Sequence, residues 1–212
     1  PGDLELAVEQ AARDFRFFHW HLRFGEVMAQ GGFDCVLGNP PWERIKLQEK
    51  EFFAARSEAI ATAPNKSARE FLIQELRLRA KQIQDQSEEP STHPDVIMVR
   101  EFDLAKREAE GSGEFIRGSG RFALTAVGDL NTYALFAEHF LRLIGPGGRS
   151  GMIVPTGIAT DNSTKAFFDE VSRNGMLASL TSFENESFIF RDVHHAYKFC
   201  CLTLRASADN AA

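Results

Sequence analysis

Residues 33–42 constrain this chain more than any other stretch, because a short apolar run ends there at two consecutive prolines. The run at residues 35–37 predicts a strand buried on both faces of a parallel sheet. A residue before proline is restricted to extended geometry, so Asn39 is expected to continue the direction of the strand. Pro40 and Pro41 fix two successive φ angles and lack N–H groups. They predict a rigid rim at the carboxyl end of the strand, where open α/β sheets bind ligands.

Trp42 adds a flat aromatic ring next to this rim. The side-chain carbonyl of Asn39, the backbone carbonyl of Pro40 and the ring together suit a planar ligand whose amino group has two N–H donors. Adenine is such a ligand. The alternative is a plain strand-to-turn connection with a surface tryptophan.

The motif Asn39-Pro40-Pro41-Trp42 resembles the (Asn/Asp/Ser)-Pro-Pro-(Tyr/Phe/Trp) motif of S-adenosylmethionine-dependent amino-methyltransferases. The surrounding Gly-Gly-Phe-Asp-Cys-Val-Leu-Gly-Asn-Pro-Pro-Trp-Glu and the upstream Phe-His-Trp-His-Leu-Arg-Phe are most similar to adenine-specific DNA methylases of restriction-modification and phage-defence systems, including the fused type IIG enzymes. The resemblance covers most of the chain and is weakest from about residue 44 to residue 120.

The resemblance implies catalytic roles for Asn39, Pro40, Pro41 and Trp42. Asn39 and the Pro40 carbonyl would accept the two amino hydrogens of a flipped adenine, and Trp42 would stack on the base. Pro41 would also contact the cofactor, S-adenosylmethionine. No strong general base is required, because the amine becomes acidic only after it gains the methyl group.

Two further aromatic residues receive roles by the same resemblance. Phe136, at the start of a helix, would line the binding site for the adenine of the cofactor, and Phe190 would stack on the target base. Phe188 and His194 are the alternatives to Phe190, and Phe190 could also be a plain core residue.

The rest of the sequence predicts an α/β fold. Apolar spacing favours a helix over residues 4–28, and residues 43–61, 67–86 and 95–109 also read as helices, followed by a flexible segment bracketed by Gly111-Ser-Gly113 and Gly118-Ser-Gly120. From residue 121 the pattern predicts a helix over 129–144 that stops at Gly145-Pro146-Gly147-Gly148, strands over 152–155, 177–183 and 197–204, and a helix over 164–173. We expect a partial Rossmann-like, doubly wound methyltransferase sheet with an antiparallel edge hairpin and a helical insertion.

We expect three parts within one partial catalytic domain: residues 1–42 with the motif, a helical insertion over 43–120, and the second half of the sheet over 121–212. No glycine-rich turn follows a strand and opens a helix, as a nucleotide-binding half of this fold requires. The N-terminal half of the methyltransferase and a target-recognition domain are therefore expected partners, and the fragment alone is expected to be inactive.

Composition limits the partners further. The net charge of −6 argues against this piece holding double-stranded DNA unaided, and the basic residues of the insertion are nearly cancelled by neighbouring glutamates. The chain begins with Pro1 and has no long apolar span, which predicts a fragment of a cytoplasmic protein without a membrane partner. His19 and His21 lack further ligands at usable spacing, so no metal site is expected. The three cysteines read as reduced core residues.

The function predicted from the sequence is transfer of a methyl group from S-adenosylmethionine to N6 of an adenine that has left the DNA duplex. Two alternatives remain at this point. One is an amino-methyltransferase that acts on a protein glutamine or on ribosomal RNA. The other is a non-catalytic, methylase-like module of a defence complex.

Overall fold

The computed structural model describes residues 2–86, 89–191 and 193–207. The chain divides into two compact units, one formed by Pro1–Pro41 with Phe136–Ala212 and the other by Trp42–Leu135.

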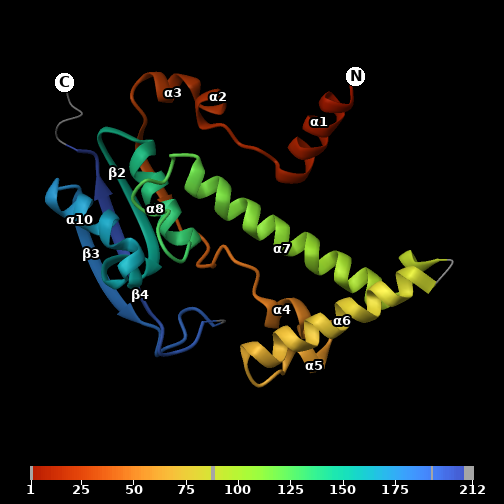
Figure 1. Cartoon of the computed structure of the whole chain (residues 1–212). Helices are drawn as coiled ribbons and strands as arrows, with labels where there is room; N and C mark the ends of the chain where they lie inside the picture. Colours follow the sequence, from red (N-terminus) through yellow and green to blue (C-terminus); the bar gives the residue numbers. More distant parts are fainter. Residues whose placement is uncertain (1, 87–88, 192, 208–212) are drawn as a thin grey trace. The chain divides into compact units, whose positions relative to one another are not determined.

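A four-stranded mixed sheet is the centre of the first unit (Figure 1). Its strands are β1 (Phe33–Gly38), β2 (Ile144–Pro155), β3 (Leu177–Glu184) and β4 (Lys198–Arg205), in the order β1-β2-β4-β3. β1 and β2 are parallel, and β4 is antiparallel to both β2 and β3. The predicted mixed α/β class and the antiparallel hairpin at one edge of the sheet are confirmed. The doubly wound Rossmann-like arrangement stays a prediction.

The register of the strands brings several chain segments to one edge of the sheet. Gly38 at the end of β1 lies opposite Met152, and Pro155 at the end of β2 lies opposite Phe199 near the start of β4. Glu184 at the end of β3 pairs with Lys198. The carboxyl ends of β1, β2 and β3 therefore meet at the edge where β4 begins.

The helices of this unit are short. They are α1 (Asp3–Phe15), α2 (Trp20–Arg23), α3 (Gly25–Ala29), α9 (Gly157–Thr160), the 3-10 turn η2 (Asn162–Thr164) and α10 (Lys165–Arg173). The helical pattern over residues 4–28, in which residues 18–24 could also be an extended passage, is interrupted in the structure, because Arg16 takes a left-handed conformation with φ of 48° and ends α1. The packed core consists of fully buried apolar side chains, among them Val154, Ile158, Phe167, Val171, Leu202 and Leu204.

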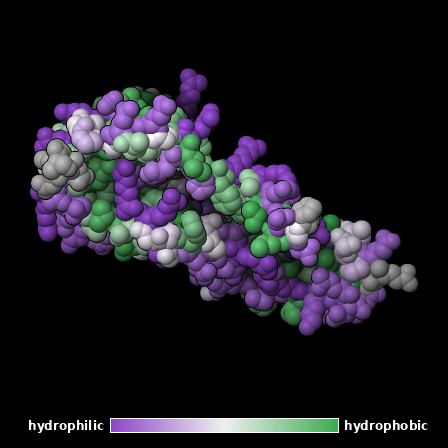
Figure 2. Space-filling view, turned by 90° about the horizontal axis from the view of Figure 1, so that it is seen from above, coloured by the Kyte–Doolittle hydropathy of each residue, from purple (hydrophilic) through white to green (hydrophobic). Residues whose placement is uncertain are grey.

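The strand that carries the motif is less covered than the sequence predicted. No residue of β1 is buried, and Cys35 and Leu37 are exposed, Leu37 by 77%. The prediction of a strand buried on both faces is wrong, because β1 is an edge strand whose partner among the described residues is β2. Cys201 is also exposed, so of the three cysteines only Cys200 lies in the core. Other apolar side chains of this unit also reach the surface, where green and purple residues intermingle (Figure 2).

The second unit is helical and has its own core. Its helices are α4 (Glu49–Ala54), α5 (Glu58–Ala61), α6 (Lys66–Gln86), the 3-10 turn η1 (Pro90–Thr92) and α7 (Pro94–Gly118). The long helices α6 and α7 pack against each other (Figure 1). Between α4, α5 and these helices lies a cluster of buried side chains, Phe53, Ile60, Ile73, Leu76 and Phe102.

Three sequence-based boundaries require correction. Residues 43–48 are not helical. The helix predicted over 129–144 does stop before Gly145, but the strand predicted over 152–155 already begins at Ile144. The predicted flexible segment at Gly111-Ser-Gly113 lies inside α7. Gly113 is buried there, and a Cβ added to it would lie 3.8 Å from Leu130 Cδ1, so the helix is held by packing that propensity does not reveal.

α8 (Thr132–Leu143) begins in the second unit and continues into the first. Its apolar face includes Ala137 and Phe140, both buried. Within the described residues, no helix has both the length and the apolar character needed to cross a bilayer.

Candidate active site

Residues 39–41, called the ledge below, follow β1 at its carboxyl end. Asn39 follows the last residue of β1 and is exposed, Pro40 is buried, and Pro41 is exposed. The buried ring of Pro40 anchors the ledge, while the amide of Asn39 remains accessible to a ligand. A carbonyl acceptor is thus presented at the carboxyl end of an edge strand, beside β2, which runs three residues beyond the partner of Gly38, from Met152 to Pro155.

An aromatic wall lies directly behind this ledge. The ring of Phe140 on α8 is so close to Gly38 that a Cβ placed there would lie 3.0 Å from its Cζ atom. Phe136 contacts Phe140 edge to face, with ring centroids 6.0 Å apart, and is itself 37% exposed. The structure therefore places Phe136 one side chain away from the residue that precedes Asn39.

We expect Gly38→Ala to destabilise the first unit, because its methyl group would meet the Phe140 ring at 3.0 to 3.1 Å. Overpacking of this kind costs about 1–3 kcal/mol. Chemical denaturation measures the loss. The matched control is Gly25→Ala, whose Cβ would meet no atom within 4 Å. Phe140→Leu should restore part of the stability in the double variant, and an equal loss in both glycine variants would contradict this packing.

The loop between β3 and β4 lies at the same edge of the sheet. Phe190 is half-buried there, and its ring meets the buried Phe199 edge to face at 5.0 Å. Phe188 is 52% exposed, with its ring centroid 6.1 Å from that of His195. His194 is exposed and lies next to His195, with ring centroids 4.4 Å apart.

Trp42 is half-buried and is the first residue of the second unit. The segment after it is extended and is held to the start of α8. The Glu43 N–H donates to Thr132 Oγ1 (3.0 Å), the Thr132 N–H donates to the Glu43 carbonyl (2.9 Å), and the Ile45 N–H donates to the Leu130 carbonyl (2.9 Å). The backbone that follows Trp42 is therefore held by this short pairing within the second unit.

The first unit contains five of the six site residues predicted from the sequence: Asn39, Pro40, Pro41, Phe136 and Phe190. Asn39 and Phe190 lie on segments at the same end of the sheet. Phe136 packs against Phe140, which lies close to Gly38. Trp42 belongs to the other unit.

The charged groups at the carboxyl ends of the strands form an ion pair on β3 and β4. Across the described part of the chain, no three His, Cys, Asp or Glu residues are grouped so that they could hold a metal ion. At the sheet edge, Lys198 Nζ lies 2.7 Å from Glu184 Oε1. Their hydrogen bond and mutual attraction lower the pKa of Glu184 and raise the pKa of Lys198, so both remain charged near neutral pH. Burial raises the pKa of the Cys200 thiol to about 11, so this thiol remains protonated.

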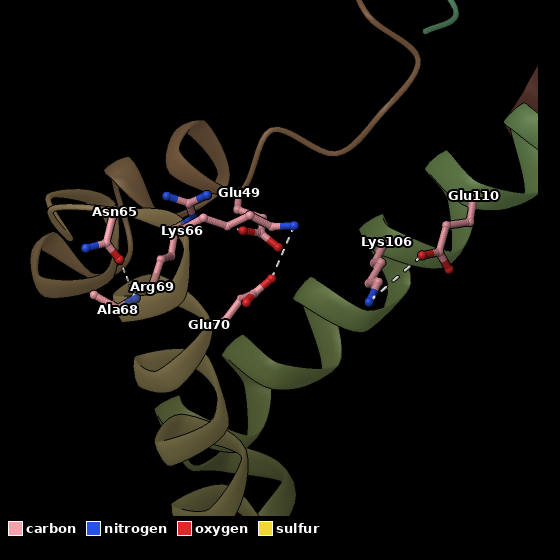
Figure 3. A network of polar contacts seen from close by, with 8 residues as sticks. All are labelled: Glu49, Asn65, Lys66, Ala68, Arg69, Glu70, Lys106 and Glu110. Carbon is pink, nitrogen blue, oxygen red and sulfur yellow. Dashed lines mark hydrogen bonds and ion pairs between the residues drawn. The ribbon is translucent and has the colours of Figure 1, made fainter. Parts of the chain in front are cut away.

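The second unit contains a charged groove of about 970 Å³ that sequence reasoning did not predict. The segment after Trp42, α6 and α7 line it. Its ion pairs include Arg69–Glu49 (2.8 Å), Lys66–Glu70 (3.4 Å) and Lys106–Glu110 (3.9 Å), of which Figure 3 shows the pairs along α6 and α7. The sequence led us to expect that glutamates nearly cancel the basic charges of this segment, and in the structure these basic side chains form ion pairs with nearby glutamates.

Sequence reasoning also missed Asn185, a fully buried side chain directly after β3. A polar residue at a strand end is too common a pattern to single it out. Its position becomes informative only when its hydrogen bonds to the following loop are known.

Comparison with known protein families identifies the segment that carries the ledge. Residues 4–83 match the Eco57I restriction-modification methylase family. The resemblance to restriction-modification methylases predicted from the motif is confirmed over this segment, which includes β1, Asn39 and Trp42. No curated protein and no solved structure gives a significant match. The match covers less than half of the 212-residue chain.

Proposed function

We propose that this chain is part of an adenine-specific DNA methyltransferase, type IIG-like, that transfers a methyl group from S-adenosylmethionine to N6 of adenine. The observation that supports this best is the exposed amide of Asn39, framed by a buried proline at the carboxyl end of β1, within a segment that matches the Eco57I family.

Two acceptors on the ledge supply the chemistry of the proposed site. The exocyclic nitrogen of adenine is a poor nucleophile because its lone pair is delocalised into the ring. Asn39 Oδ1 and the Pro40 carbonyl accept its two hydrogens and favour a pyramidal nitrogen with a localised lone pair. These acceptors stabilise positive charge that develops on the nitrogen during transfer. The rigid proline frame keeps them in place, which supplies orientation.

The residues near the ledge fit the adenosyl part of the cofactor. Phe136 offers a partly exposed ring next to Phe140, and Pro41 offers an exposed apolar edge. We assign both residues to cofactor contact. When bound, S-adenosylmethionine supplies an electrophilic methyl group on its sulfonium.

The target base must leave the duplex, which costs a few kcal/mol. We propose that Trp42 stacks on the extruded adenine, together with an aromatic residue of the β3–β4 loop, for which the sequence suggests Phe190. Stacking on an aromatic side chain is worth about 1–3 kcal/mol per base and offsets much of this cost.

The partners proposed are double-stranded DNA, the N-terminal half of the methyltransferase and a target-recognition domain. The uncovered edge and faces of β1, with Leu37 and Cys35 exposed, support the addition of further strands next to β1. The net charge of −6 supports a basic DNA-binding surface on another part of the enzyme. In this proposal residues 1–42, 43–120 and 121–212 are the motif-bearing segment, the helical insertion and the second half of one partial catalytic domain.

The test uses the complete enzyme and S-adenosylmethionine with a tritiated methyl group. We expect label in duplex DNA, at N6-methyladenine after digestion to nucleosides. Label in ribosomal RNA or in protein glutamine, with none in DNA, would replace the substrate proposed here. No transfer to any of the three by an intact, folded enzyme would indicate a non-catalytic module.

A further inference from the structure

We propose that Asn185 is a positioning residue that shapes the β3–β4 loop so that Phe188, and not Phe190, contacts the extruded base. This inference rests on the function proposed above and refines which loop residue serves it.

Asn185 uses its whole side-chain amide within the loop. Its Nδ2 group donates to the carbonyls of Phe190 (2.9 Å) and Val193 (2.8 Å), and its Oδ1 accepts the N–H of Phe190 (3.0 Å). The side chain is completely buried. If one of these hydrogen bonds broke while the side chain stayed buried, no water would replace it, and the unpaired polar group would destabilise the loop. Its main chain adds two more hydrogen bonds, from the Asn185 N–H to the Tyr197 carbonyl (3.1 Å) and from the Phe188 N–H to the Asn185 carbonyl (2.8 Å).

These hydrogen bonds fix Phe190 as an anchor of the loop. Both its N–H and its carbonyl are bound by Asn185, and its ring meets Phe199 edge to face at 5.0 Å. Phe199 is 5% exposed and stacks on Phe183 at 5.5 Å. Phe190 therefore presents less of its ring to a ligand than the more exposed Phe188 does.

Phe188 has the opposite surroundings. It is 52% exposed and has a φ of 49°, a left-handed conformation that non-glycine residues rarely adopt. An uncommon backbone conformation maintained by a buried hydrogen-bond network is typical of functional positions. Its ring lies near that of His195, and the two form an exposed aromatic surface.

The sheet register places this surface on the correct side of the molecule. The loop leaves β3 at Glu184 and enters β4 at Lys198, at the edge where Asn39 follows β1. β4 is two strands away from β1, which corresponds to about 10 Å across the sheet. The register places Gly38 level with Leu202, and the loop joins β4 four residues further on, at Lys198, so an aromatic side chain of this loop must reach back to meet a base held at the ledge.

The experiment uses the complete enzyme and a duplex with 2-aminopurine at the target position, whose fluorescence rises when the base leaves the stack. We expect Phe188→Ala to reduce the extruded population about tenfold, with an unchanged melting temperature. We expect Phe190→Ala to lower the melting temperature and to leave the extrusion per folded enzyme near the wild-type value. The reverse pattern would overturn the proposal and assign the base contact to Phe190.

Asn185→Ala tests the positioning role. We expect a loss of extrusion as large as that of Phe188→Ala, and no further loss in the double variant, because both changes remove the same contact. Additive losses would indicate a general structural role and overturn the proposal. The matched control is Asn174→Ala, because Asn174 is an exposed asparagine whose amide donates a surface hydrogen bond to Glu170 (2.7 Å). If Asn185→Ala does not fold, the comparison of Phe188→Ala with Phe190→Ala still decides.

The result for the wild-type enzyme separates the two levels of the proposal. Wild-type methylation of adenine in DNA, with normal extrusion by the Phe188 and Asn185 variants, would reject this inference alone. Absence of any DNA methylation by the folded wild-type enzyme would reject the proposed function and, with it, the role of the loop.

Discussion

Replacing Asn39 with alanine in the complete enzyme should abolish methyl transfer to DNA while leaving the affinity for S-adenosylmethionine largely unchanged. Asn39 is exposed at the end of β1, and in the proposed function its Oδ1 atom is one of two acceptors for the target amino group. Loss of one preorganised polar group at a reacting centre lowers kcat by about 10²–10³-fold. Single-turnover transfer of tritiated methyl groups measures the loss, and calorimetry measures the affinity for the cofactor.

Asn39→Asp is the matched control for this variant. It keeps an acceptor oxygen at the same position and has the size of the native side chain, so we expect measurable activity. Wild-type rates for Asn39→Ala would remove Asn39 from the mechanism. Loss of cofactor binding in parallel with activity would indicate that the ledge had collapsed.

Trp42→Ala should weaken binding of the extruded base more than it harms folding. If its ring supplies about 1–3 kcal/mol of stacking, the extruded population should fall by about 5–150-fold. Fluorescence of 2-aminopurine at the target position reports this population, and denaturation of the same variant reports folding. Trp42→Phe retains an aromatic face and should preserve most of the extrusion.

Trp20→Ala provides a second control for Trp42→Ala. Trp20 stacks on Phe24 at 5.6 Å and meets Phe33 and His139 edge-on or tilted, so its removal should lower stability and leave extrusion per folded enzyme unchanged. Unchanged extrusion in Trp42→Ala would count against the stacking role, and equal effects of both tryptophan variants would show that neither contact is specific.

Local sequence patterns correctly predicted the helices and strands that bury a regular apolar face of their own. The strands predicted over 177–183 and 197–204 and the helix predicted over 164–173 match β3, β4 and α10 within a few residues. These segments bury regular apolar faces, with Phe167 and Leu202 fully enclosed, and the periodicity of the sequence reflects that burial directly.

The failures have a common physical cause, which is that burial depends on neighbours that a local pattern does not contain. The apolar run of β1 predicted a covered strand, yet the edge position leaves Leu37 exposed. The glycines near residue 111 predicted a flexible segment, yet α7 continues through them because Gly113 packs close to Leu130.

The candidate site was predictable to the extent that it is contiguous in sequence. Asn39 and the prolines were identified from one motif, and the structure places Asn39 on an exposed ledge. The contact of Phe140 with Gly38 joins residues about a hundred positions apart, and no local pattern predicts it. The hydrogen bonds of Asn185 join residues that are close in sequence, but they depend on the loop conformation and not on a recognisable motif.

The helical unit is joined to the sheet unit at two covalent crossings, Pro41–Trp42 and Leu135–Phe136. Each crossing contains a residue assigned here to the base or to the cofactor. The two crossings are also fastened to each other by the pair of hydrogen bonds between Glu43 and Thr132. A displacement of the start of α8 is therefore transmitted through these two hydrogen bonds to the segment that follows Trp42.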